Sequence, residues 1–177
     1  MARKKQRTKG AQTGNTFPGL MVSDRVELKD VQLISCKCHQ TPKAATGKKT
    51  YNINYSAKVE TDKKKGHVVV LPEFYFEAFS EAETREPVIL IDASFVLAYK
   101  INDFKGLTKR GFEQFANLNG IYNAWPYWRE LVQNIIVRMG LPSLSIPVFR
   151  IAEAPKQKGV KQKEAKTKVK KKKMRKG

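Results

Sequence analysis

The chain has 177 residues and a formal net charge of +19 at pH 7, with 35 basic and 16 acidic residues. This length suits one folded domain with a hydrophobic core, plus tails. No apolar run approaches the roughly 18 residues that cross a bilayer, which excludes a membrane-spanning helix. Two cysteines, Cys36 and Cys38, are too few for a secreted disulfide scaffold, so we expect a cytoplasmic protein.

The positive charge is concentrated at the two ends. Residues 1–10 carry five basic residues and no acid, and residues 152–177 carry twelve basic residues against two acids. We therefore expect a basic disordered arm over residues 1–16, a folded domain over 17–151 and a lysine-rich disordered tail over 152–177. Two interpretations of the tails stay open. Either they only solubilise the protein, or they bind nucleic acid or anionic surfaces without sequence specificity.

The first half of the expected domain contains two stretches in which apolar and polar residues alternate, as they do in β-strands. The first covers residues 25–38 and changes phase near Lys29 and Asp30, which indicates a β-bulge or a bend. A long loop over His39 to Lys49 separates it from the second stretch, residues 51–60, where the alternation is cleanest.

Two further strands follow. Residues 68–79 alternate in the same way, but Pro72 lacks a backbone N–H, which predicts a bulge or an edge position. An acidic connector over residues 80–87 leads to the fourth strand, residues 88–100.

Helical spacing replaces the strand pattern after residue 108. Apolar residues recur at every third or fourth position up to residue 122, but Gly120 weakens this helix near its end. We therefore expect the helix to break or bend near Gly120. Because Pro126 suits the first position of a helix, we expect a second helix to start there and to end before Gly140. These elements predict an α+β fold, with a four-stranded antiparallel sheet followed by a long broken helix pair.

Three aromatic residues lie close together at the start of the second helix. Trp125, Tyr127 and Trp128 cannot all face the same side of a helix. At least one of them should therefore pack outside the core, against another subunit or a bound chain.

Two motifs in this region resemble a known family. The runs Trp125-Pro-Tyr-Trp-Arg-Glu130 and Leu141-Pro-Ser-Leu-Ser-Ile146 are similar, at the same separation, to runs in SecB, the bacterial export chaperone. The resemblance implies a dimer of dimers that holds unfolded precursor polypeptides in apolar grooves and passes them to the SecA motor.

The resemblance also assigns roles to particular residues. The client groove would be formed by Trp125, Tyr127, Trp128, Leu141 and Leu144, with the loop from His39 to Lys49 at its rim. Subunit association would use Phe112, Phe115 and Leu118.

Docking of SecA would use Asp30, Leu90 and Asp92. Two features depart from the family pattern at this point. Ile34 stands where the family carries an acid, and the C-terminal tail is basic rather than acidic. A solitary SecB-like chaperone that serves one partner, such as an antitoxin, fits these departures.

The sequence offers no pattern for catalysis. It has only two histidines, His39 and His67, and no nucleophile triad, phosphate-binding loop or zinc-protease motif. The run Cys36-Lys-Cys38-His39 has too few ligands for a closed zinc site, so we interpret the cysteines as free thiols and expect neither metal nor cofactor. Our leading hypothesis is an ATP-independent holdase, and its rivals are a nucleic-acid-associated protein that binds through its tails and a chaperone dedicated to one partner.

Overall fold

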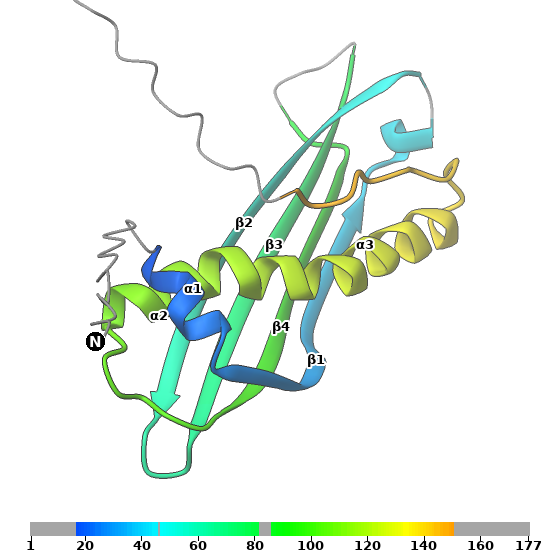
Figure 1. The fold of residues 1–177 in the computed structure, drawn as a ribbon. Helices are drawn as coiled ribbons and strands as arrows, with labels where there is room; N and C mark the ends of the chain where they lie inside the picture. Colours follow the sequence, from blue (N-terminus) through cyan, green and yellow to red (C-terminus); the bar gives the residue numbers. More distant parts are fainter. Residues whose placement is uncertain (1–16, 46, 82–85, 151–177) are drawn as a thin grey trace, which may run out of the picture.

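The computed structural model describes residues 17–45, 47–81 and 86–150. These residues form one antiparallel sheet that a long helix crosses on a single face (Figure 1). The predicted tails lie outside the described residues. No helix in the described ranges is long and apolar enough to cross a membrane.

The sheet has four strands in the order β1-β4-β3-β2. The strands are β1 (Val26–Gln40), β2 (Lys49–Asp62), β3 (His67–Ser80) and β4 (Ile89–Ile101), and every neighbouring pair is antiparallel. All four predicted strands are therefore confirmed. The order makes β1 and β2 the two edges, and a short 3-10 helix, η1 (Pro42–Ala45), lies in the connection between them.

Strand β1 contains two irregularities. The register shifts between Leu28 and Asp30, which confirms the predicted change of phase. A second shift between Leu33 and Ser35 leaves Ile34 without a partner, and the sequence analysis did not anticipate it. Because of the two shifts, apolar residues of β1 keep facing the helix side along the whole strand.

Pro72 corrects one prediction. It lies in β3, which is a central strand, and the pairing with β2 runs past it without a bulge. Pairing with β4 lapses instead, because Val70 pairs with Leu97 and the next pair is Glu73 with Ser94. The missing N–H of Pro72 therefore interrupts the pairing on one side of β3, and it does not force the strand to the edge of the sheet.

The long helix is continuous and has three parts: α2 (Lys109–Phe115), a π-helical turn η2 (Ala116–Gly120) and α3 (Ile121–Arg138). Thr108 caps its start by accepting a hydrogen bond from the Gly111 N–H. The π-helical turn lies where the sequence predicted a break or bend, near Gly120. The predicted restart at Pro126 is wrong, because this exposed proline lies inside α3. Two asparagines in η2 fasten the helix: Asn117 accepts from the β2 backbone and Asn119 donates to Ser23.

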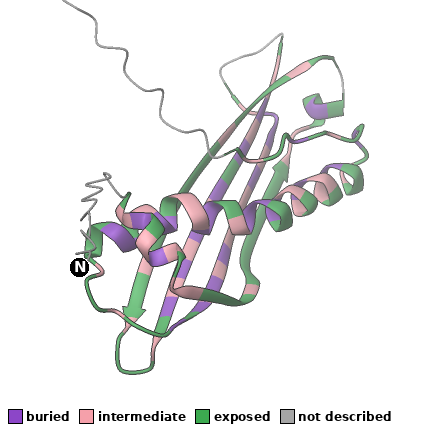
Figure 2. Cartoon of the chain, in the orientation of Figure 1, coloured by how far each residue is buried: buried purple, intermediate pink, exposed green. Residues whose placement is uncertain are grey.

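A short helix that the sequence did not reveal, α1 (Pro18–Ser23), packs against α2 (Figure 1). On the sheet side, Gly120 lets the helix come close to β3, since a Cβ there would lie 2.7 Å from Cγ1 of Val70. The core lies between the helix and the central strands, whose residues alternate between buried and half-buried (Figure 2). We call the other side of the sheet, which points away from α2 and α3, the open face.

Candidate functional site

Strand β2 is an edge strand whose helix-side residues are only partly covered (Figure 2). We call this row the β2 track: Tyr51, Ile53, Tyr55, Ala57 and Val59. Each of these residues is half-buried or exposed, although their partners on β3 are buried. The track therefore presents an apolar and aromatic strip, because the helix covers the central strands and leaves this edge partly open.

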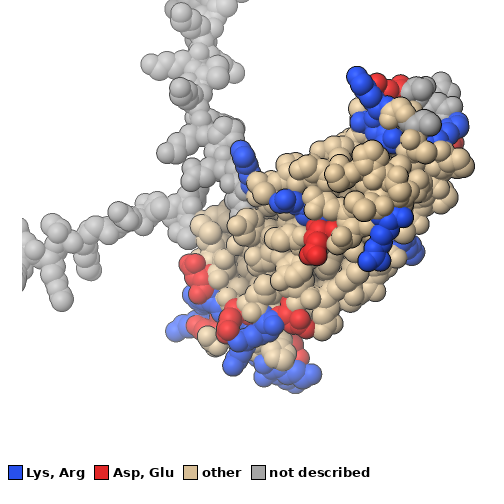
Figure 3. Space-filling view, turned by 90° about the vertical axis from the view of Figure 1, so that its right-hand side faces the viewer, with Lys and Arg blue, Asp and Glu red and all other residues tan. Residues whose placement is uncertain are grey.

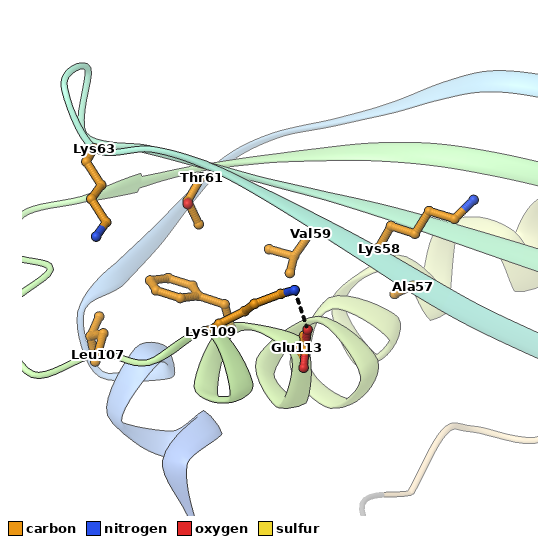
Figure 4. Close-up of a pocket in the computed structure, with 9 residues that line it drawn as sticks. Ala57, Lys58, Val59, Thr61, Lys63, Leu107, Lys109 and Glu113 are labelled. Carbon is orange, nitrogen blue, oxygen red and sulfur yellow. Dashed lines mark ion pairs between the residues drawn. The ribbon is translucent and has the colours of Figure 1, made fainter.

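A pocket of about 560 Å³ lies at one end of the β2 track, between β2 and α2 (Figure 4). We call it the α2 pocket. Val59, Leu107 and Phe112 supply apolar surface, and Lys63 and Lys109 are among its charged lining residues. Its size falls in the range of sites that accept a drug-sized molecule or a few side chains.

A second pocket of about 260 Å³ lies at the other end of the β2 track, and we call it the strand-end pocket. Tyr51 and Phe76 come from the sheet, Ile136 from α3, and Leu141 and Leu144 from the segment after the helix. Gly47 and Lys49, from the end of the predicted rim loop, also line it. Two predicted groove residues and part of the predicted rim therefore meet at this pocket.

The segment 141–150 has no regular secondary structure and packs between the long helix and the sheet. Its Ile146 is buried, and the ring of Phe149 contacts Tyr55 at 5.5 Å and Trp125 at 5.1 Å between centroids. The indole Nε1 of Trp125 donates a 2.9 Å hydrogen bond to the carbonyl of Pro147. This contact holds the segment beside the β2 track.

The predicted aromatic groove residues separate into surface and core. Trp125 and Tyr127 line a hollow of about 400 Å³ beside α3, but Trp125 is largely buried and only Tyr127 is well exposed. Trp128 is 0% exposed and stacks on Phe74 with 5.0 Å between ring centroids. It therefore supports the helix from within the core and cannot contact a client directly while the domain is folded.

The residues predicted for subunit association are also mainly internal. Phe112 and Phe115 are buried, with ring contacts to Phe104 at 5.9 Å and Tyr99 at 5.1 Å respectively, and Leu118 is half-buried. The first two rings pack under the helix because α2 presents its apolar stripe to the sheet. Both rings therefore contribute mainly to the core of the single chain, and their role in subunit association stays a prediction.

The predicted motor-docking residues all lie on the open face. Asp92 is opposite Lys37 and Leu90 is opposite His39, whereas Asp30 is opposite Ala98, further along β4. Ala98 lies six positions after Asp92 along β4, or about 20 Å at the usual rise per residue. The structure therefore places Leu90 and Asp92 together and Asp30 apart from them on the same surface.

The two cysteines are exposed free thiols on the helix side of β1. Burial raises the pKa of the Cys36 thiol, so this group is less reactive than an ordinary thiol. His39 belongs to the opposite face of the strand, and in the described ranges no three His, Cys, Asp or Glu residues cluster as metal ligands would.

The outer backbone of β2 is partly occupied. The Ala57 N–H donates a 3.3 Å hydrogen bond to Oδ1 of Asn117, so it points away from β3. Backbone groups alternate in direction along an antiparallel strand, so those of Tyr55, Val59 and Thr61 point outward as well. Within the part of the chain that the structure describes, these outward groups face no other strand.

The groove residues predicted from the family motifs do not include Tyr51, Tyr55 and Phe149, which form much of this surface. The alternation around Tyr51 and Tyr55 predicted a half-buried strand but not which of its side chains stay exposed. The available signal was the two tyrosines, since a side chain with an apolar body and a polar tip suits a half-exposed position.

No protein-family model and no curated protein matches the sequence. Among solved structures, the chain is similar to Rv1957, a SecB-like chaperone of Mycobacterium tuberculosis, in complex with a ChAD peptide from the Rv1956 HigA1 antitoxin. The TM-score is 0.64 and the identity 22%, over 75% of this chain and 96% of that one. A protein of unknown function from Streptococcus agalactiae is 10% identical over 69% of this chain and 96% of that one, and its TM-score of 0.36 is too low to indicate a shared fold. The first likeness confirms the SecB-like fold that the two motifs predicted.

Proposed function

We propose that this protein is an ATP-independent holdase chaperone that binds exposed apolar segments of unfolded or precursor polypeptides in the cytoplasm. It is a binding protein rather than an enzyme, with no metal or cofactor. The observation that carries the proposal is the β2 track with an apolar pocket at each end.

The affinity for such segments would come from the burial of their apolar side chains. Each large apolar side chain that leaves water contributes about 1.5–3 kcal/mol. Two or three such side chains in the pockets support affinities of roughly micromolar strength, once the cost of ordering the client is subtracted. Outward backbone groups of β2 can add main-chain hydrogen bonds without regard to client sequence.

A dedicated partner is the second candidate. It is favoured by the similar SecB-like chaperone of Mycobacterium tuberculosis, whose structure contains a peptide from an antitoxin. For this chain, a single partner would occupy the same surface, because its apolar side chains would be buried in the same pockets as those of a general client.

We place subunit association at the free edge of β1, as part of the same proposal. Leu33 and Ile34 are 46% and 54% exposed there, and β1 runs for 15 residues without a proline. The molecule seen from the side of β1 and α3 has few charged side chains in its middle (Figure 3). A long edge strand without proline can pair with another strand, so a second copy is a fitting occupant.

The open face is the proposed surface for a further protein, such as SecA. Leu90 and Asp92 are adjacent on it, and Glu73 and Glu77 lie on the neighbouring strand. This surface would attract a basic partner, in contrast to the strongly positive charge of the whole chain.

The test is suppression of aggregation of a chemically denatured client by the purified full chain without nucleotide. Leu144→Asp places a charge in the strand-end pocket and should weaken suppression severalfold, whereas Leu20→Asp, an exposed leucine on α1, should not. No suppression by the wild type, or equal loss in both variants, would reject the proposal. Binding that is restricted to one co-purifying partner would favour the dedicated chaperone.

A further inference from the structure

The α2 pocket combines apolar surface with clustered positive charge. Val59, Leu107 and Phe112 provide the apolar surface, and the turn from Lys63 to Lys65 stands over the end of β2 (Figure 4). This pocket differs from the strand-end pocket, whose described lining residues include a single charged one, Lys49.

The acids near the α2 pocket are already engaged. Glu113 pairs with Lys109 at 3.8 Å, and Asp62 pairs with Lys65 at 3.8 Å. The side chain of Lys63 lies on the pocket side of β2 and forms no ion pair with the described residues (Figure 4). The mouth of the pocket therefore keeps an excess of positive charge.

The third lysine of the lining contributes little to this excess. Lys58 points away from the pocket and pairs with Glu73 at 3.2 Å (Figure 4). The unpaired positive charge that a ligand meets is that of Lys63, in the turn after β2. Lys109 of α2 adds a second amine, but it shares its charge with Glu113 of the same lining through an exposed pair of 3.8 Å.

The backbone adds a constraint on the shape of the ligand. Val59 and Thr61 present outward backbone groups beside the pocket, whereas Asn117 occupies the N–H of Ala57. An extended segment can pair with the strand at Val59 and Thr61, but it must leave the strand or displace Asn117 to continue. The pocket is thus a separate subsite for a short extended segment.

We infer that the α2 pocket selects acid-flanked apolar segments, in which one or two large apolar side chains enter the pocket and adjacent Asp or Glu carboxylates contact Lys63 and Lys109. This inference rests on the proposed function and names the class of client segment that this part of the site prefers. A nucleic acid would use the same lysines but not the apolar floor, which is why a peptide fits better.

The test uses three labelled peptides with the same central Leu-x-Leu and with Glu, Gln or Lys at the flanking positions, titrated onto the full chain. We expect the Glu peptide to bind about three- to tenfold more tightly than the Gln peptide at low salt, and the Lys peptide to bind more weakly than either. Replacing Lys63 and Lys109 by Gln should abolish this preference. The matched control, Lys37→Gln with Lys100→Gln, changes the net charge equally on other parts of the sheet and should preserve it.

Three results would overturn the inference. Equal affinity for the Glu and Gln peptides would show that charge does not select clients, while client binding itself would stand. Equal effects of the two double variants, or equally tight binding of a Glu peptide without leucines, would assign the preference to overall charge. Failure of all three peptides to bind would reject the proposed function together with the inference.

Discussion

Two tyrosines on opposite sides of the sheet allow a sharp test of the β2 track. Tyr55 is 44% exposed and lies on the track, whereas Tyr75 is 40% exposed and lies on the open face. They are close in the ladder, because Tyr55 pairs with Phe74, the neighbour of Tyr75. Replacing either residue by Ser therefore removes a similar exposed aromatic area, but only one replacement acts on the proposed client surface.

The expected magnitude follows from the exposed area of Tyr55. A tyrosine side chain offers about 200 Å² in total, so this exposed fraction is roughly 90 Å², worth about 2 kcal/mol when a client covers it. The affinity for an apolar peptide should accordingly fall by up to about 30-fold in Tyr55→Ser. For Tyr75→Ser, which loses a hydrogen bond to Glu73, we expect less than a twofold change in peptide affinity.

Fluorescence anisotropy of a labelled apolar peptide measures both affinities, and urea denaturation confirms that both variants are folded. The check is needed because Tyr55 also contacts Trp125 and Phe149, with ring centroids at 5.9 and 5.5 Å. Equal losses in the two folded variants would refute the assignment of client binding to the β2 track.

Three further outcomes are expected. Gly120→Ala should destabilise the wild type, because the added Cβ would lie 2.7 Å from Val70. The same substitution should stabilise a Val70→Ala background, because alanine favours a helix more than glycine does. Urea denaturation of the four proteins should give a coupling free energy of about 2 kcal/mol, and additive effects would contradict the close approach. Burial raises the pKa of Tyr99 to about 12. Its neutral form therefore favours the fold below pH 10, and this contribution is lost as the pH rises towards 12. Tyr99→Phe should reduce the loss of stability over that interval by about 2–3 kcal/mol in denaturation at each pH, and an unchanged pH profile would argue against the burial effect. Lys in place of Leu33 and Ile34 should shift the protein towards monomer in sedimentation velocity, and an unchanged mass would exclude the β1 edge as the subunit contact.

The strands were predictable because each turns alternate side chains towards the helix side and towards the open face, which leaves a period of two in its sequence. The bulge near Lys29 is visible in the sequence as a change of phase in the apolar alternation. The second bulge, at Ile34, was hidden because it restores the earlier phase. Pro72 was misjudged because sequence cannot tell which neighbour of a central strand loses its hydrogen bond.

The helix shows a similar limit. Its apolar period was clear, and the irregularity predicted near Gly120 is present as the π-helical turn η2, where Gly120 allows close contact with the sheet. Pro126 indicated the start of a second helix, but it lies on the exposed side inside α3, and the sequence alone does not show that the helix continues through it.

Part of the candidate site was accessible from sequence and part was not. Leu141 and Leu144 were found through the family motif and do line a pocket. Trp128 was assigned to the surface because a motif gives a position on a helix but not the neighbour that the side chain meets. Tyr55 was overlooked because its exposure depends on β2 being an edge, which is a property of strand order.

The two free edges of the sheet lie on opposite sides of the subunit. Association through one of them would leave the other uncovered in every copy, so the number of client-binding edges would grow with the number of chains. A long unfolded polypeptide could then bind to several copies at once. Weak individual contacts would combine into strong avidity, while each stretch could still be released separately.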